Sequence, residues 1–166
     1  QEFQKMIEDL NMDSAATVSQ DPRGIALEID GDICFESSQV KMKPKLIEAL
    51  DRAIKDILTE ENDLRPIIVE GHTDSDVLRG KMEKVYPSNW ELSTARASEV
   101  VRYLISKGVN FTRLNPSGYA DTWPVGITWT QRRANQVSRE LIDSMNGTKE
   151  LKRKNRRIKI IIGPNY

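Results

Sequence analysis

The spacing of apolar and polar residues predicts four strands. Residues 23–29 alternate apolar and polar side chains, which indicates a half-buried strand. Residues 67–69 form a continuous β-branched run that ends at Gly71, which indicates a buried strand. Two more strands are predicted at residues 114–120 and 158–162. The stretch from Ser14 to Pro22 is polar and turn-like, so we predict a linker or loop there.

Between these strands, apolar residues recur at helical spacing. They predict helices over residues 44–61, 92–107 and 131–145, a short helix at 148–151 and a weak helix within 1–13. Pro44 suits a first helical turn, and Gly108 is a natural C-terminal stop. The order of elements predicts an α/β (α+β) sandwich with helices packed on a mixed four-stranded sheet. We expect one domain over residues 23–166, preceded by a linker or helix at 1–22.

Two residues of opposite charge stand at the ends of the central elements. Asp74 follows the strand at 67–69, and Arg96 lies in the first turns of the helix at 92–107, about one residue off its apolar stripe. The stem of Arg96 can therefore pack while its guanidinium stays free. One interpretation is recognition of a zwitterion, with Asp74 on an ammonium and the planar guanidinium on a carboxylate. The other is a salt bridge between the two residues, which spacing alone favours.

The motifs resemble those of the OmpA-like peptidoglycan-binding domain. They are Gly71-His72-Thr73-Asp74, then Asn89, Leu92, Ser93, Arg96 and Ala97, and later Asn155-Arg156-Arg157. The sequence of residues 88–93 and the long loop before it resemble one branch of this family in particular, the flagellar motor stator B subunits (MotB). The resemblance covers roughly residues 23–162 and implies a βαβαβ(α)β arrangement. Residues 126–146 depart from the family pattern and are interpreted as a helical insertion.

What the resemblance implies for the site is a peptidoglycan cleft. Asp74 and Arg96 would grip the free diaminopimelate end of a stem peptide, while Phe35, Asn89, Leu92 and Thr73 would shape the cleft. His72, Asn155 and Arg157 would support the cleft residues without contacting the ligand. On burial rates alone, Phe35 is more simply a core aromatic, and both descriptions hold if one ring face lines the cleft.

Catalysis and metal binding find no support in the sequence. His72 is the only histidine, no nucleophile elbow is present, and no ligand spacing is recognisable. The single cysteine, Cys34, excludes an internal disulfide and a thiolate-rich metal site. We therefore expect no enzyme activity, no metal and no cofactor.

Charge balances overall but not along the chain. Residues 1–63 carry 7 basic and 15 acidic side chains, whereas residues 131–166 carry 10 and 3. Residues 152–159 hold six basic side chains in eight, which on its own is a candidate nucleic-acid patch. A solvated basic stretch that balances the acidic first third is the simpler interpretation, and no aromatic residues interleave with it for base stacking.

The resemblance also implies partners and a location. A MotB-like domain would lie in the periplasm and bind the wall as a homodimer. An N-terminal transmembrane segment absent from this chain would join it to the stator A subunit in the inner membrane. No run here approaches about 18 apolar residues, and the abrupt start at Gln1 is consistent with an excised piece. Alternatives are an OmpA- or lipoprotein-type envelope anchor without a motor role, and a nucleic-acid-binding module.

Overall fold

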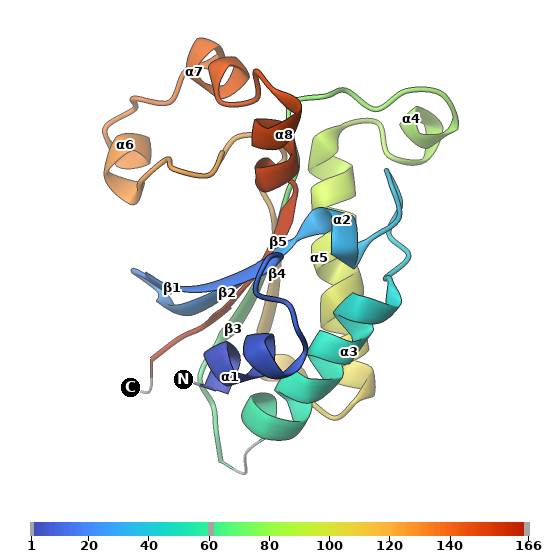
Figure 1. The fold of residues 1–166 in the computed structure, drawn as a ribbon, viewed down its shortest axis with the longest axis vertical. Coiled ribbons are helices and arrows are strands. Elements are labelled where there is room, and N and C mark those ends of the chain that lie inside the picture. The colour runs from blue at the N-terminus through green and yellow to red at the C-terminus, as the bar shows by residue number, and fades with distance from the viewer. Residues whose placement is uncertain (1, 60–61, 165–166) are drawn as a thin grey trace.

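The centre of the protein is a five-stranded mixed sheet. The computed structural model describes residues 2–59 and 62–164. Its strands lie in the order β1-β2-β5-β3-β4 (Figure 1). They are β1 (Ala16–Asp21), β2 (Gly24–Asp30), β3 (Ile67–His72), β4 (Leu114–Gly118) and β5 (Arg157–Ile162). Neighbours are antiparallel except β3 and β4, which are parallel, so the predicted mixed α/β class is confirmed.

Strand β1 corrects two predictions, the four-stranded sheet and the linker at residues 14–22. It pairs with β2 from Ala16 opposite Ile29 to Asp21 opposite Gly24. Only its two end residues are buried, and the residues between them are polar or partly exposed. Edge strands carry such polar sequences because their outer backbone groups face solvent. This polarity makes an edge strand resemble a linker in sequence.

Three helices cover one face of the sheet and enclose the core. They are α1 (Glu2–Asp9), α3 (Pro44–Ala53) and α5 (Asn89–Ser106) (Figure 1). Helix α3 continues into a π-helical turn, η1 (Ile54–Leu58), and the predicted helix end at residue 61 lies outside the described residues. Phe3, Met6 and Ile7 of α1 are buried in this core. The N-terminal helix therefore packs on the domain.

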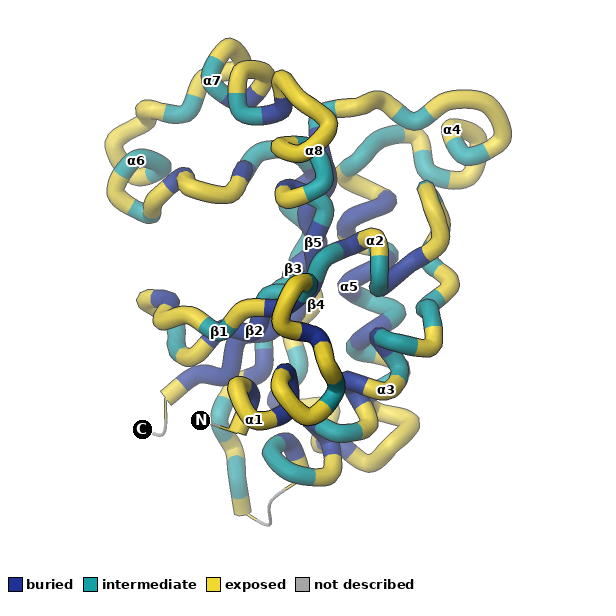
Figure 2. The backbone as a smooth tube through the Cα atoms, viewed as in Figure 1, coloured by how far each residue is buried: buried dark blue, intermediate teal, exposed yellow. Residues whose placement is uncertain are grey.

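The remaining helices are short. They are α2 (Gly31–Cys34), α4 (Lys81–Val85), η2 (Phe111–Arg113), α6 (Trp129–Arg133), α7 (Arg139–Ser144) and α8 (Lys149–Asn155). Residues 126–146, which we call the arm, lie on the side of the sheet away from α3 and α5 and are largely exposed (Figures 1 and 2). Within the described ranges, no helix is long and apolar enough to cross a membrane.

The single helix predicted over 131–145 is wrong, because the arm holds two short helices instead. Thr128 and Ser138 each cap a separate helix by accepting a hydrogen bond from a backbone N–H in its first turn. Between them, Asn135 adopts a left-handed conformation with φ of 57°, which a continuing α-helix does not allow. Side-chain caps therefore override the apolar periodicity.

The two faces of the sheet differ in chemistry. Leu27, Ile160 and Val69 face the helical core from three neighbouring strands. One residue further along, Glu28, Lys159 and Glu70 form an in-register row on the opposite face, which we call the outer face. Glu70 is only 1% exposed, so this row is partly covered.

Two glycines set the distance between the sheet and α5. Gly71 of β3 lies opposite Gly118 of β4 in the parallel pair. A Cβ built on Gly71 would lie 2.2 Å from the Ser93 carbonyl oxygen, and one on Gly118 would lie 2.1 Å from Thr94 Oγ1. Only glycine permits this approach. The start of α5 is thereby held against the C-terminal ends of β3 and β4.

Candidate ligand-binding cleft

A cavity of about 520 Å³ opens beside the C-terminal end of β3. Its walls come from α2, the loop after α2, the loop after β3 and the start of α5. The six residues that the sequence assigns to the cleft all line it: Phe35, Thr73, Asp74, Asn89, Leu92 and Arg96. Residues that are far apart in sequence thus share one cavity, which we call the cleft.

Asp74 is fixed at the strand end, and its partner is Arg156 rather than Arg96. Asp74 Oδ1 accepts a hydrogen bond from the Asp76 backbone N–H at 2.9 Å, and Oδ2 accepts one from Arg156 Nη1 at 2.7 Å. Arg156 also donates to both carboxylate oxygens of Asp32, at 3.0 and 3.1 Å. These bonds to Asp32 and Asp74 raise the pKa of Arg156 despite partial burial, and they lower that of Asp32. The salt bridge between Asp74 and Arg96 considered above is not formed.

Arg96 is buried at the other end of the cleft, with 8% of its surface exposed. Its Nε donates to the Gln39 carbonyl oxygen at 2.8 Å and its Nη2 to that of Glu36 at 3.3 Å. The prediction of a free guanidinium is therefore wrong, because the loop after α2 reaches over it. Burial lowers the pKa of Arg96 to about 10, which still leaves it protonated at neutral pH.

Phe35 belongs to both the core and the cleft. It is 2% exposed and packs within the hydrophobic core. The guanidinium carbon of Arg96 lies 5.0 Å from the centre of its ring, a cation–π contact. Leu92, 3% exposed, adds an apolar patch to the wall. The two interpretations of Phe35 therefore apply together.

Thr73 and Asn89 hold the loop after β3 in shape. Thr73 Oγ1 donates to the Asp74 carbonyl oxygen at 2.8 Å. Asn89 Nδ2 donates to the carbonyl oxygens of Asp76 at 2.8 Å and Asp74 at 3.4 Å. Because Asn89 begins α5, these bonds join the first turn of that helix to the strand end that carries Asp74.

His72 lies behind the cleft, on the outer face. Its Nε2 is 3.0 Å from Glu70 Oε1, and its ring stacks on Tyr119 with centroids 5.2 Å apart. Burial lowers the pKa of His72 to about 3, so the ring is neutral and Nε2 donates to Glu70. Burial alone would raise the pKa of Glu70, but the hydrogen bonds from His72 and Arg23 lower it.

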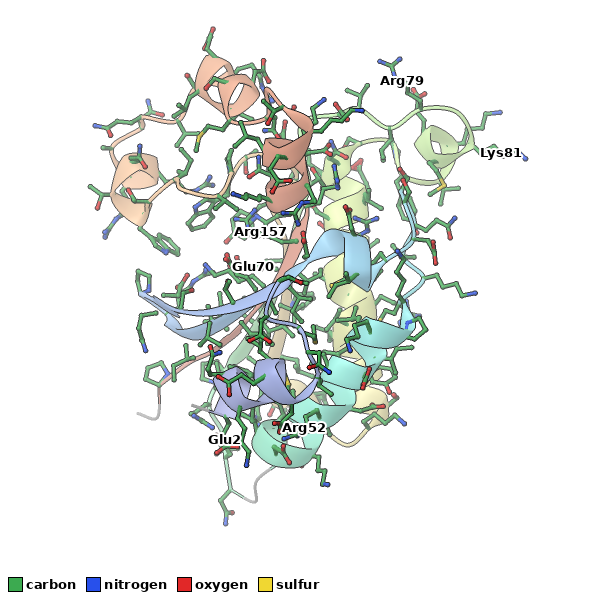
Figure 3. All side chains as sticks on the ribbon, viewed as in Figure 1. Glu2, Arg52, Glu70, Arg79, Lys81 and Arg157 are labelled. Atoms are coloured by element: carbon green, nitrogen blue, oxygen red, sulfur yellow. The ribbon has the colours of Figure 1, made fainter. Side chains whose placement is uncertain are left out.

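Asn155 and Arg157 connect the same region to the arm. Asn155 Oδ1 accepts from the Val125 backbone N–H at 2.8 Å, and its Nδ2 donates to the Met145 carbonyl oxygen at 3.0 Å. Arg157 Nη2 donates to the Trp123 carbonyl oxygen at 2.9 Å. Glu70 and Arg157 are both labelled in Figure 3, on β3 and β5. Neither Asn155 nor Arg157 lines the cleft, and both bond to the backbone of neighbouring segments instead.

Arg156 and Asp32 are two of the lining residues that sequence reasoning did not assign to the cleft wall. Both line the cavity, where they are paired with each other. The available signal was the position of Arg156 between Asn155 and Arg157 in the motif. Its direction could not be foreseen, because Arg156 lies between α8 and β5 and follows the side-chain period of neither element.

The basic C-terminal third faces the acidic first third. Arg153 pairs with Asp30, Arg156 with Asp32, and Lys159 with Asp21. Lys152 reaches Asp76 in the loop after β3 at 3.0 Å. Most charges of the basic run are thus neutralised within the domain, which leaves little positive potential for a polyanion.

The cleft thus holds the Asp74 carboxylate, paired with Arg156, at one end and the buried guanidinium of Arg96 at the other. The chain belongs to the OmpA family, whose family model matches residues 34–128.

Similar proteins share the sequence or the fold. A curated relative, YtxE from Bacillus subtilis (strain 168), is 34% identical over 157 residues, which cover 94% of this chain and 55% of that protein. The chain thus spans little more than half of that relative.

Two solved structures resemble the fold over nearly the whole chain. One is a MotB-like protein from Desulfovibrio vulgaris, with a TM-score of 0.76 and 18% identity over 99% of this chain and 90% of that one. The other is the cell wall anchor of the type VI secretion system from Pseudomonas aeruginosa, with a TM-score of 0.74 and 23% identity over 98% and 97%.

Proposed function

We propose that this domain is a non-catalytic peptidoglycan-binding module that anchors a MotB-like flagellar stator to the cell wall. The observation that carries the proposal is the meeting of Asp74 and Arg96 in one cleft, although they are 22 positions apart. Membership of the OmpA family and the fold shared with a MotB-like protein support it.

The ligand proposed is the free diaminopimelate end of a stem peptide, which carries an ammonium and a carboxylate on one carbon. The ammonium would lie against Asp74 and Asp32, and the carboxylate against the guanidinium of Arg96. Among the described residues, Arg96 makes hydrogen bonds only through Nε and Nη2, so its Nη1 is available for a carboxylate. Lysine at this position would keep the charge and lose the planar fork.

Binding at a single cleft should be weak. Charge-assisted hydrogen bonds contribute about 1.5–3 kcal/mol each. The ammonium must share Asp74 with Arg156, so a dissociation constant of about 1 mM is expected. Several domains on one polymer would gain by effective concentration, which suits an anchor that holds a network. In this proposal the domain is periplasmic, acts as a homodimer and joins the stator A subunit through a transmembrane segment of the longer protein.

The test is a pull-down on purified sacculi with the wild type, Asp74→Ala, Arg96→Ala and Arg96→Lys. All three variants should lose retention while their unfolding midpoints stay within a few degrees of the wild type. Arg102→Ala is the matched control, because Arg102 lies on the same helix with its side chain 76% exposed. Retention of wild-type strength in folded Asp74→Ala or Arg96→Lys would refute the assignment.

An envelope anchor without a motor role would use the same cleft, so this assay does not separate it from a stator. The separation rests on the longer protein: a transmembrane helix with an ionisable residue supports the stator, and a barrel or lipidated cysteine refutes it. Nucleic-acid binding is disfavoured by the pairing of the basic run with Asp21, Asp30 and Asp32.

A further inference from the structure

A second hollow, of about 450 Å³, lies on the outer face of the sheet. It is bounded on one side by the turn between β1 and β2 and on the other by residues 123–130 and α6. We call it the outer groove. It shares no lining residue with the cleft, and the strand β5 that begins with Arg157 forms part of its floor.

The charges in the floor are already neutralised. Lys159 Nζ lies 2.8 Å from Asp21 Oδ2, and Arg157 Nε lies 3.4 Å from Glu28 Oε1. Hydrogen bonds from Arg23 and Lys159 lower the pKa of Asp21 against the opposing effect of its burial, so its carboxylate stays ionised within the pair. An isolated ion would have to break one of these pairs. The floor therefore offers an ion only charges that already have partners.

The walls offer an aromatic surface and uncommitted hydrogen-bonding groups. Trp129 is half-buried in the wall. The guanidinium carbon of Arg23 lies 4.9 Å from the centre of its ring and covers one face, and Trp123 meets it edge to face with centroids 4.8 Å apart. Gln20, Thr130 and Arg133 are exposed around the groove, and their side chains have no hydrogen-bond partner among residues 2–59 and 62–164. An amide, a hydroxyl and a guanidinium thus remain free beside an indole.

This combination matches a sugar. A pyranose ring has an apolar C–H face that packs on an indole, and its hydroxyl and acetamido groups need donors and acceptors around the rim. A volume of about 450 Å³ lies in the range of small-ligand pockets. We propose that the outer groove binds the glycan strand of the same wall polymer. This inference rests on the proposed function, because it gives the backbone of that polymer a site beside the cleft for its peptide.

The position of the two sites supports a shared polymer. Arg156 lines the cleft and Arg157, the next residue, lines the outer groove. The start of β5 therefore separates the two sites by one strand. A peptide branch and its parent glycan strand could each occupy one of them at the same time.

The test uses chitotetraose and, separately, a soluble tripeptide that ends in a free diaminopimelate. Binding is followed by NMR of the indole N–H signals, of which the chain has three, from Trp90, Trp123 and Trp129. Chitotetraose should shift the Trp129 signal and leave that of Trp90 unchanged. The Trp129→Ala variant should bind chitotetraose at least about tenfold more weakly, in line with tryptophan hot spots. Trp90→Ala, which removes an exposed tryptophan outside the groove, should bind within about twofold of the wild type.

A second variant is needed because Trp129→Ala could weaken binding by disturbing the arm. The double substitution of Gln20→Ala and Thr130→Ala removes only exposed groups and should weaken chitotetraose binding about threefold with an unchanged unfolding midpoint. Unchanged binding in both variants, or no wild-type binding, would overturn the groove assignment.

The tripeptide separates this proposal from the previous one. Both proposals are supported if Asp74→Ala loses tripeptide binding and keeps chitotetraose binding, while Trp129→Ala keeps tripeptide binding and loses chitotetraose binding. If the wild type binds the tripeptide but not chitotetraose, the outer groove is refuted and the cleft stands. If chitotetraose binds and the tripeptide does not, the cleft assignment fails instead.

Discussion

The two faces of the sheet are built from the same strands by opposite chemistry. Toward the helices, Leu27, Ile160 and Val69 form a continuous apolar layer. Away from them, Glu28, Lys159 and Glu70 form a charged row in the same register. The apolar layer is stabilised by removal of surface from water, whereas the charged row depends on each partner being present. One face therefore tolerates gradual change, and the other does not.

The largest effect should come from Glu70 on the charged face. Glu70→Ala leaves Arg23 and His72 without their shared buried acceptor, and we expect a loss of about 3–5 kcal/mol of unfolding free energy. Urea unfolding at pH 7 measures it. Glu99→Ala is the control, because Glu99 pairs with Arg102, whose side chain is 76% exposed, so its loss should cost less than about 1 kcal/mol. Equal costs for the two would remove the distinction between buried and exposed charges.

A somewhat smaller effect is expected on the apolar face. Ile160 is 1% exposed, and Ile160→Ala should cost about 3 kcal/mol through lost burial and the cavity left behind. Ile160→Val should cost about 1 kcal/mol, since it removes one methylene. The graded series is the signature of packing. A threshold response, with no cost for valine and full cost for alanine, would contradict it.

Asn155 tests how the outer face is joined to the arm. Asn155→Ala removes the hydrogen bonds to Val125 and Met145 and should cost about 2 kcal/mol. Hydrogen exchange should accelerate over residues 126–146 and stay unchanged in β3. Lys154→Ala is the control, because it changes an exposed neighbour on the same helix. Uniform acceleration over the whole domain would mean that the arm does not open separately.

Between about pH 5 and 6.5, the pH dependence of stability should report the protonation of His72. The pKa of His72 is lowered to about 3 in the folded state, against about 6.5 when unfolded. Stability is thus fully present above pH 6.5 and is lost as pH falls, by about 1 kcal/mol per unit. Because His72 is the only histidine, His72→Gln should flatten the curve between pH 6.5 and 5. An unchanged slope in that variant would place the titrating group elsewhere.

Sequence predicts the apolar face better than the charged one. Apolar periodicity places β2, β3, β5 and the central helix, because burial against one core imposes a regular pattern. It misses β1, whose polar residues lie at an edge, and it joins two arm helices that local caps keep apart. The partner of Asp74 could not be predicted, since Arg156 lies 82 positions away and between α8 and β5.

The hydrogen bonds of the Asn155 side chain also bear on how the arm can change in length. One side chain holds the residue before the arm, Val125, and a residue at its end, Met145. The two ends of the arm are therefore held close together by Asn155, and the chain between them forms a closed loop. The entropy of closing such a loop grows only slowly with its length, by about 0.6 kcal/mol per doubling. The loop can lengthen, shorten or diverge while Arg156, just before β5, keeps its place, so the cleft and the arm can evolve independently.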